Sequence, residues 1–221
     1  MITFEHVAPK LCSFAQGYQQ NELLYNLALL LHQNSLGREE LRRILLESPS
    51  FCLTGIFDRF AFAWFRAPKR YPKIAVLALK ELLALKSLSQ IAEQEMWEVF
   101  KEHCQAECLQ PNKRNGQRTV RGLTSFASEL AQQGLSIATF IARQIETGSA
   151  RDTYLTLRTK GGLGPKIAAF LLRDMVWILD LERSIERSDH YLLQPIDMWV
   201  KRTAICFWPE LEQRSNSSVA K

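Results

Sequence analysis

A glycine-rich run is the stretch of this sequence whose residue types and spacing are best suited to chemistry. It reads Lys-Gly-Gly-Leu-Gly-Pro-Lys-Ile-Ala over residues 160–168. Gly162 and Gly164 permit positive φ angles and a close backbone approach, and Pro165 stands where a helix would begin, since a missing N–H costs nothing there. The residues on both sides have helical spacing. Two helices joined by a hairpin with exposed N–H groups would form a site suited to phosphate.

The same run, together with Pro-Ile-Asp-Met-Trp-Val-Lys-Arg at residues 195–202, resembles a known family. It is similar to the helix-hairpin-helix and Pro-x-Asp loop of the endonuclease III and 8-oxoguanine DNA glycosylase superfamily. In bifunctional members, a lysine two residues after the second hairpin glycine is the nucleophile, and an aspartate opening a later helix is the shared carboxylate. The resemblance, which covers residues 151–203, places these roles on Lys166 and Asp197. It implies a DNA glycosylase with lyase activity that acts as a monomer on double-stranded DNA containing a damaged base, without a cofactor or metal.

The two side-chain types suit that reaction. Cleavage of an N-glycosidic bond develops positive charge on the sugar, so a fixed carboxylate beside C1′, such as Asp197, lowers the barrier. An amine that is at least partly neutral can attack the same carbon and form a Schiff base, which allows strand cleavage. Lys166 would be that amine. The alternatives without catalysis are that Lys166 is a solvated lysine in the first turn of a helix and that Asp197 only caps a helix.

The spacing of Lys166 and Asp197 indicates which branch of the superfamily the sequence resembles. Asp197 follows Lys166 by 31 positions (197 − 166), a longer gap than in the common members of the superfamily. The gap is similar to that of the archaeal 8-oxoguanine glycosylase branch, which favours an oxidised purine as the substrate. The surplus residues, 181–191, are polar and are expected to form an inserted loop or an extended helix end.

A damaged base must leave the duplex to be reached, and stacking on aromatic side chains is the usual way to hold it. Trp199, Phe207 and Trp208 are close enough in sequence to Asp197 to be candidates for the wall of a base pocket. Core packing is the alternative role for at least two of them.

The most basic segment of the chain is expected to be a loop. Residues 109–122 include Pro111 and Asn115-Gly116 together with four cations. Three of these cations, Lys113, Arg114 and Arg118, are candidates for contacts with the DNA backbone, because each could neutralise a phosphate. A solvated linker is the alternative. A second basic, proline-broken connection at residues 66–73 allows the same two interpretations.

The fold is predicted to be all-α, because apolar residues recur at helical spacing along the chain and no segment shows sustained alternation. Residues 1–212 are expected to form one helical domain in two packed lobes around a cleft, with the helix-hairpin-helix at 151–179 and a polar tail at 213–221. Helices are expected at residues 22–32, 38–47, 51–65, 73–85, from about 90 to 108, 123–133, 137–146 and 151–159, and after Pro165.

The amino-acid composition gives weaker evidence than the motifs about the partner and the location of the protein. Lys and Arg number 28 against 23 acidic residues, a net charge of +5 that mildly favours an acidic partner such as DNA. The five cysteines lack a disulfide framework, and no apolar targeting or membrane-spanning segment is evident, so an intracellular protein, cytoplasmic or nuclear, is expected. His103, Cys104 and Cys108 share a helical face but lack a fourth ligand, which disfavours a zinc site.

Two other functions remain open. A helix-hairpin-helix module without catalysis would bind duplex DNA through Gly162 and Gly164 and leave it intact. A helical interaction protein would use the hairpin only as a turn. Lys166 and Asp197 favour the enzyme, and a salt-dependent affinity for DNA would separate the last reading from the others.

Overall fold

The computed structural model describes residues 22–30, 36–62, 69–194 and 205, and within this part of the chain every regular element is a helix. The predicted all-α class is therefore confirmed for these residues. The α-helices are α2 (Leu24–Leu30), α3 (Arg38–Glu47), α4 (Pro49–Arg59), α5 (Arg70–Leu85), α6 (Glu93–Ala106), α7 (Asn115–Gln132), α8 (Ile137–Thr147), α9 (Ala150–Thr159) and α10 (Pro165–Ile178). Short 3₁₀ helices are η2 (Leu88–Gln90), η3 (Glu182–Ser184) and η4 (Arg187–Leu193).

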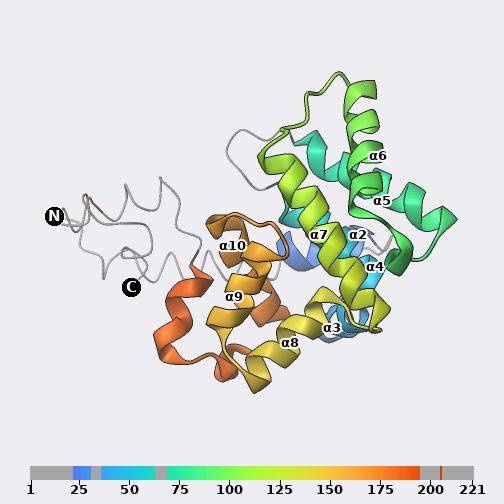
Figure 1. Cartoon of the computed structure of the whole chain (residues 1–221). Coiled ribbons are helices and arrows are strands. Elements are labelled where there is room, and N and C mark those ends of the chain that lie inside the picture. Colours follow the sequence, from blue (N-terminus) through green and yellow to red (C-terminus); the bar gives the residue numbers. More distant parts are fainter. Residues whose placement is uncertain (1–21, 31–35, 63–68, 195–204, 206–221) are drawn as a thin grey trace.

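Helices α4 and α7 join two groups of helices. Helices α5 and α6 pack together on one side, against α4 and α7 respectively. Helices α8, α9 and α10 pack on one another on the other side (Figure 1), and α8 also contacts α3, α4 and α7. The glycine-rich hairpin between α9 and α10 therefore lies beside a helix, α7, that belongs to the middle of the molecule.

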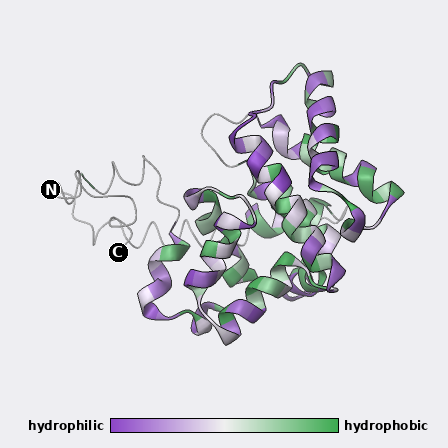
Figure 2. Ribbon diagram, viewed as in Figure 1, coloured by the Kyte–Doolittle hydropathy of each residue, from purple (hydrophilic) through white to green (hydrophobic). Residues whose placement is uncertain are grey.

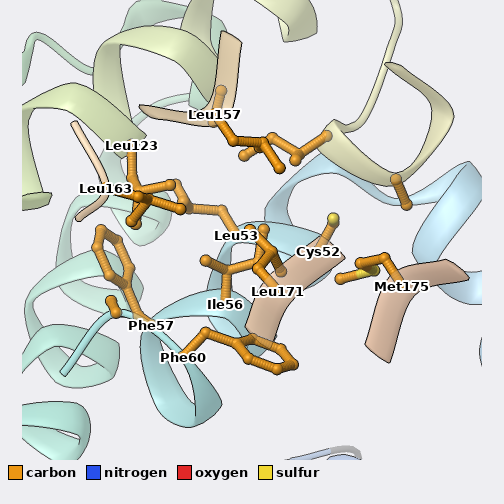
Figure 3. Packing of buried hydrophobic residues seen from close by; sticks show 14 of the residues in the cluster. Cys52, Leu53, Ile56, Phe57, Phe60, Leu123, Leu157, Leu163, Leu171 and Met175 are labelled. Atoms are coloured by element: carbon orange, nitrogen blue, oxygen red, sulfur yellow. The ribbon is translucent and has the colours of Figure 1, made fainter. Parts of the chain in front are cut away.

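One continuous hydrophobic core runs through the described residues, from Leu23 to Leu192. Helix α4 supplies its centre, because residues 52–57 are all buried, with Leu53 and Phe57 fully inaccessible. Green apolar positions accordingly gather where helices meet, and purple hydrophilic ones lie along the outer faces (Figure 2). Phe57 and Phe60 lie in this core (Figure 3).

Several helix boundaries follow the sequence pattern, but the start of α7 does not. The helix predicted at 123–133 begins at Asn115, so most of the predicted basic loop is helical. The Asn112 side-chain oxygen accepts hydrogen bonds from the backbone N–H groups of Arg114, at 3.0 Å, and Asn115, at 2.7 Å. These bonds satisfy amide groups that a helix start leaves without partners. The Asn-Gly pair is thus part of a helix start rather than a turn.

Two further segments depart from the sequence expectation. Helix α5 starts at Arg70, three residues before the predicted start, because Pro72 falls in its first turn, where no N–H is needed. The segment at residues 181–191 is neither an open loop nor a helix extension. It forms η3 and most of η4, and buries Leu181 and Ile185 against the core.

The polar tail, residues 213–221, lies outside the described residues. Within the described ranges, the helices are too short or too polar for any of them to cross a membrane.

Candidate functional site

Gly162 and Gly164, in the hairpin between α9 and α10, have different backbone conformations and different roles. Gly162 has a φ of +66°, the left-handed conformation that favours glycine. Gly164 has a φ of −69° and a ψ of 161° and is the N-cap residue of α10, with Pro165 at the first helical position. The sequence allowed positive φ at both glycines, and the structure uses it only at Gly162.

Polar contacts and one apolar side chain hold the hairpin in place. The Gly162 carbonyl accepts hydrogen bonds from Arg118 Nε, at 3.1 Å, and from Thr119 Oγ1, at 3.5 Å. Leu163 is only 2% exposed and lies in the core beside Leu123 of α7 (Figure 3). The hairpin is therefore a fixed part of the fold, attached to the first turns of α7.

A direct contact between backbones brings the hairpin this close to α7. A Cβ atom built on Gly122 would lie 2.8 Å from the carbonyl carbon of Gly161 and 2.8 Å from the nitrogen of Gly162. Side-chain carbon atoms do not come this close to backbone, so Gly122 is the residue in α7 that permits the contact. The sequence did not predict this role, because Gly122 fell in the expected loop at residues 109–122, whereas it lies inside α7.

Gly164, in contrast, has open space around it. A Cβ at Gly164 would meet no atom within 4 Å, so internal packing does not require glycine there. The N–H groups of Gly162 and Gly164 donate no hydrogen bond to any described residue. The positive end of the α10 dipole lies at the same place. This end of the hairpin has the donors that an anion needs.

Lys166 lies in the first turn of α10, next to these donors, and is half-buried. Its Nζ atom is 5.7 Å from the centre of the Phe170 ring, and the Arg173 guanidinium is 4.9 Å from the same ring. Arg173 Nε also donates to Oδ1 of Asp174 at 2.6 Å, and Asp174 is fully buried. We call these four residues the Phe170 cluster. Asp174 interrupts an otherwise apolar stripe along α10, and this interruption is the one sign of the cluster in the sequence.

Four predicted site residues lie outside the described residues: Asp197, Trp199, Phe207 and Trp208. The carboxylate and base-pocket roles given to them therefore stay predictions.

The predicted basic residues differ in what they contact. Lys113 and Arg114 are exposed and form no ion pair with a described residue. Arg118 lies in the first turns of α7 rather than in a loop, and its Nε supports the hairpin. Arg121 is paired with Glu93. Lys113 and Arg114 thus keep the exposure that a phosphate contact requires, whereas Arg118 has a structural contact as well.

The residues considered for a metal are not gathered into a site. His103 Nε2 lies 2.8 Å from Glu81 Oε2, and burial raises the pKa of the Cys104 thiol to about 11. No group of three or more potential metal-binding side chains occurs in the part of the chain that the structure describes.

Comparisons of the chain with protein-family models, with curated proteins and with solved structures found no match. The arguments for function therefore rest on the hairpin, on the residues around it and on the sequence resemblance.

The contact between Gly122 and the hairpin predicts an unusual response to alanine. Alanine normally stabilises the interior of a helix by about 1 kcal/mol relative to glycine. At Gly122 the added Cβ would meet backbone that cannot rotate away, so we expect Gly122→Ala to lower the free energy of unfolding by about 1–3 kcal/mol, as overpacking does. Thermal or urea denaturation measures the change.

Gly55 provides the matched control, because it is also a glycine within a helix. A Cβ there would lie 3.1 Å from Cδ2 of Leu27, the end of a flexible side chain. Gly55→Ala should therefore have little effect on stability or increase it. Equal stability of the two variants would contradict the account of the hairpin given above.

Proposed function

We propose that this chain is a DNA glycosylase with associated lyase activity, of the helix-hairpin-helix superfamily, which removes 8-oxoguanine and cleaves the strand through a Schiff base on Lys166. The observation that carries this proposal is the position of Lys166, in the first turn of α10, directly after the open donors of the hairpin. This arrangement would hold a DNA phosphate and an amine within one turn of helix.

The hairpin would bind the backbone of the damaged strand. The N–H group of Gly164 would donate to a phosphate oxygen, and the dipole of α10 favours the negative charge. Such contacts position the duplex but read no sequence, which suits an enzyme that must find damage in any sequence context.

Lys166 would then act on C1′ of the damaged nucleotide. Its amine nitrogen attacks C1′, a nitrogen–carbon bond forms, and the bond to the base breaks, with the bonding electrons leaving on the base. The bond from C1′ to the ring oxygen then breaks as the C1′–nitrogen double bond of the Schiff base forms, and the ring oxygen takes the electrons of the broken bond and the proton that the nitrogen loses. Asp197 would stabilise the positive charge that develops on the sugar. The ring of Phe170 contacts the Lys166 side chain and supports its position.

A non-catalytic duplex-binding module is the alternative function. Its hairpin would have the same geometry, and the two functions differ only in whether Lys166 reacts. Binding and cleavage must therefore be measured separately.

For binding, we expect Gly164→Val to weaken affinity for duplex DNA about tenfold or more, the cost of about one hydrogen bond to a charged group. Its side chain would occupy the space through which a phosphate approaches the N–H groups. The fold should be unaffected, since a Cβ at Gly164 meets no atom within 4 Å. Fluorescence anisotropy with a labelled duplex measures the affinity.

Gly37 is the matched control for this substitution. It is the N-cap of α3, with a φ of −71° and a ψ of 152°, and a Cβ there also meets nothing within 4 Å. It lies next to Arg38, which binds Asp180 just beyond the far end of α10. Gly37→Val should leave DNA affinity unchanged. An unchanged affinity in folded Gly164→Val would remove the hairpin from the interface.

For catalysis, we expect Lys166→Gln to slow strand cleavage of an 8-oxoguanine duplex by at least about a thousandfold, because an amide cannot form the imine. Affinity should change little. Single-turnover cleavage followed on a denaturing gel measures the rate, and Asp197→Asn should slow base removal in the same assay.

Lys160→Gln is the control, since it removes the same charge from the other side of the hairpin. Lys160 is exposed and paired with Glu129 at 2.7 Å, a contact worth little to stability. Its cleavage rate should be that of the unaltered protein. If folded Lys166→Gln cleaves as fast as the unaltered protein, Lys166 is not the nucleophile; if the unaltered protein binds every damaged duplex and cleaves none, the non-catalytic module is the better interpretation.

A further inference from the structure

Two basic segments that are far apart in the sequence lie together in the structure. Lys69, Arg70 and Lys73 are exposed at the start of α5, and Lys113 and Arg114 are exposed just before α7. We call these five residues the α5–α7 strip. The sequence allowed a phosphate contact for each segment separately, but gave no sign that the two are neighbours.

Two contacts join the segments. Arg70 Nη1 lies 2.8 Å from Glu107 Oε2, and the Tyr71 hydroxyl donates a hydrogen bond to the Gln110 carbonyl. Lys113 follows Gln110 by three residues, which span at most about 11 Å. Figure 1 shows the connection from α6 to α7 passing the start of α5. The start of α5 is therefore a neighbour of the start of α7.

The strip continues to the hairpin through α7. Arg118 lies about one helical turn, roughly 6 Å, after Arg114, and its Nε donates to the Gly162 carbonyl. From the hairpin to the start of α5 the cations thus follow one another along the first turns of α7 and the connection before them.

The charge of this surface is strongly positive. Among the described residues, the one ion pair that involves the strip is that of Arg70 with Glu107, so four of its five cations are outside any such pair. Asp58, at the end of α4, also lies near Lys73. Burial raises the pKa of Asp58, and the nearby charges of Arg59 and Lys73 lower it less. Since Lys73 has this neighbour inside the protein, the test below leaves it unchanged.

We propose that the α5–α7 strip binds backbone phosphates of the duplex to one side of the damaged nucleotide, beyond the hairpin. This inference rests on the proposed function, because it takes the hairpin as the point where the damaged strand is held. DNA has regularly spaced negative charges, so it can contact cations on both segments, which are forty positions apart in the sequence (113 − 73) and joined by the Tyr71–Gln110 and Arg70–Glu107 contacts. DNA bound in this way would extend farther on one side of the lesion than on the other.

The test uses two duplexes of equal length that carry an abasic-site analogue, one with the analogue near one end and one with it near the other. The unaltered protein should bind one of them more tightly, because only that duplex reaches the strip. On that duplex, Lys69→Gln with Arg70→Gln should flatten the slope of log affinity against log salt by about 1.8, the value for two phosphate contacts. Lys113→Gln with Arg114→Gln should do the same. On the other duplex neither double variant should differ from the unaltered protein.

A matched control removes two charges elsewhere. Arg183 and Arg187 are exposed in η3 and η4, beyond the end of α10 that is opposite to the hairpin. Arg183→Gln with Arg187→Gln should leave both salt slopes unchanged. The proposal is overturned if this control flattens the slope as much as the strip variants do, if the strip variants weaken both duplexes equally, or if the unaltered protein does not distinguish the duplexes.

Two other outcomes separate this inference from the proposed function. If vesicles containing anionic lipid bind the unaltered protein as tightly as DNA does, and the strip variants abolish that binding, the strip is a membrane contact and the inference fails. If the analogue adds nothing to affinity and Lys166→Gln changes no activity, the glycosylase proposal fails. The strip is then tested on undamaged duplexes of increasing length. If the strip variants show the same salt slope as the unaltered protein on these duplexes, the proposal for the strip is overturned.

Discussion

The contact between Gly122 and the backbone of Gly161 and Gly162 is the constraint on which the rest of the site depends. Helix α7 and the hairpin approach until backbone meets backbone, with no room for one additional carbon atom. This approach lets Arg118 reach the Gly162 carbonyl and lets Leu163 enter the core. The open N–H groups and Lys166 are then held on a rigid base, as a site that binds a phosphate and positions a nucleophile requires.

The same constraint accounts for the difference between the hairpin glycines. Gly161 and Gly162 are required by the protein's own packing, since a Cβ on Gly161 would lie 2.6 Å from the Leu157 carbonyl oxygen and Gly162 has a positive φ. Gly164 has no such internal reason. Gly164 shares this property with Gly37, the N-cap of α3, and differs from it in standing two residues before Lys166.

Sequence reasoning was most successful where the pattern is local. Helix α3 has the predicted bounds, and the hairpin with Pro165 at the first helical position of α10 lies where the glycines indicated it. The capping box of Ser87 and Gln90 at the start of η2 is local in the same way. These features depend on residues within one or two turns of each other, so the sequence contains the information they need.

The features that could not be predicted depend on tertiary contacts. The role of Gly122 requires knowing that the hairpin packs on α7, and the α5–α7 strip requires the Tyr71–Gln110 hydrogen bond, which joins residues in different helical segments. The predicted start of α7 was wrong, because the hydrogen bonds to the Asn112 side chain stabilise a helix start where the Asn-Gly pair indicated a turn. The one sign of the Phe170 cluster in the sequence is Asp174, a carboxylate within an apolar stripe. A sequence pattern does not show that Arg173 and Lys166 both contact the ring of Phe170.

The central claim is that Lys166 forms a covalent bond to the sugar, and identifying the attached residue tests it most directly. Borohydride added during the reaction with an 8-oxoguanine duplex reduces a transient Schiff base to a stable amine. Proteolysis and mass spectrometry then locate the nucleotide on the peptide. The account predicts the adduct on Lys166. An adduct on Lys160 or Lys201, or the absence of any adduct with 8-oxoguanine, other damaged bases and abasic sites, would contradict it.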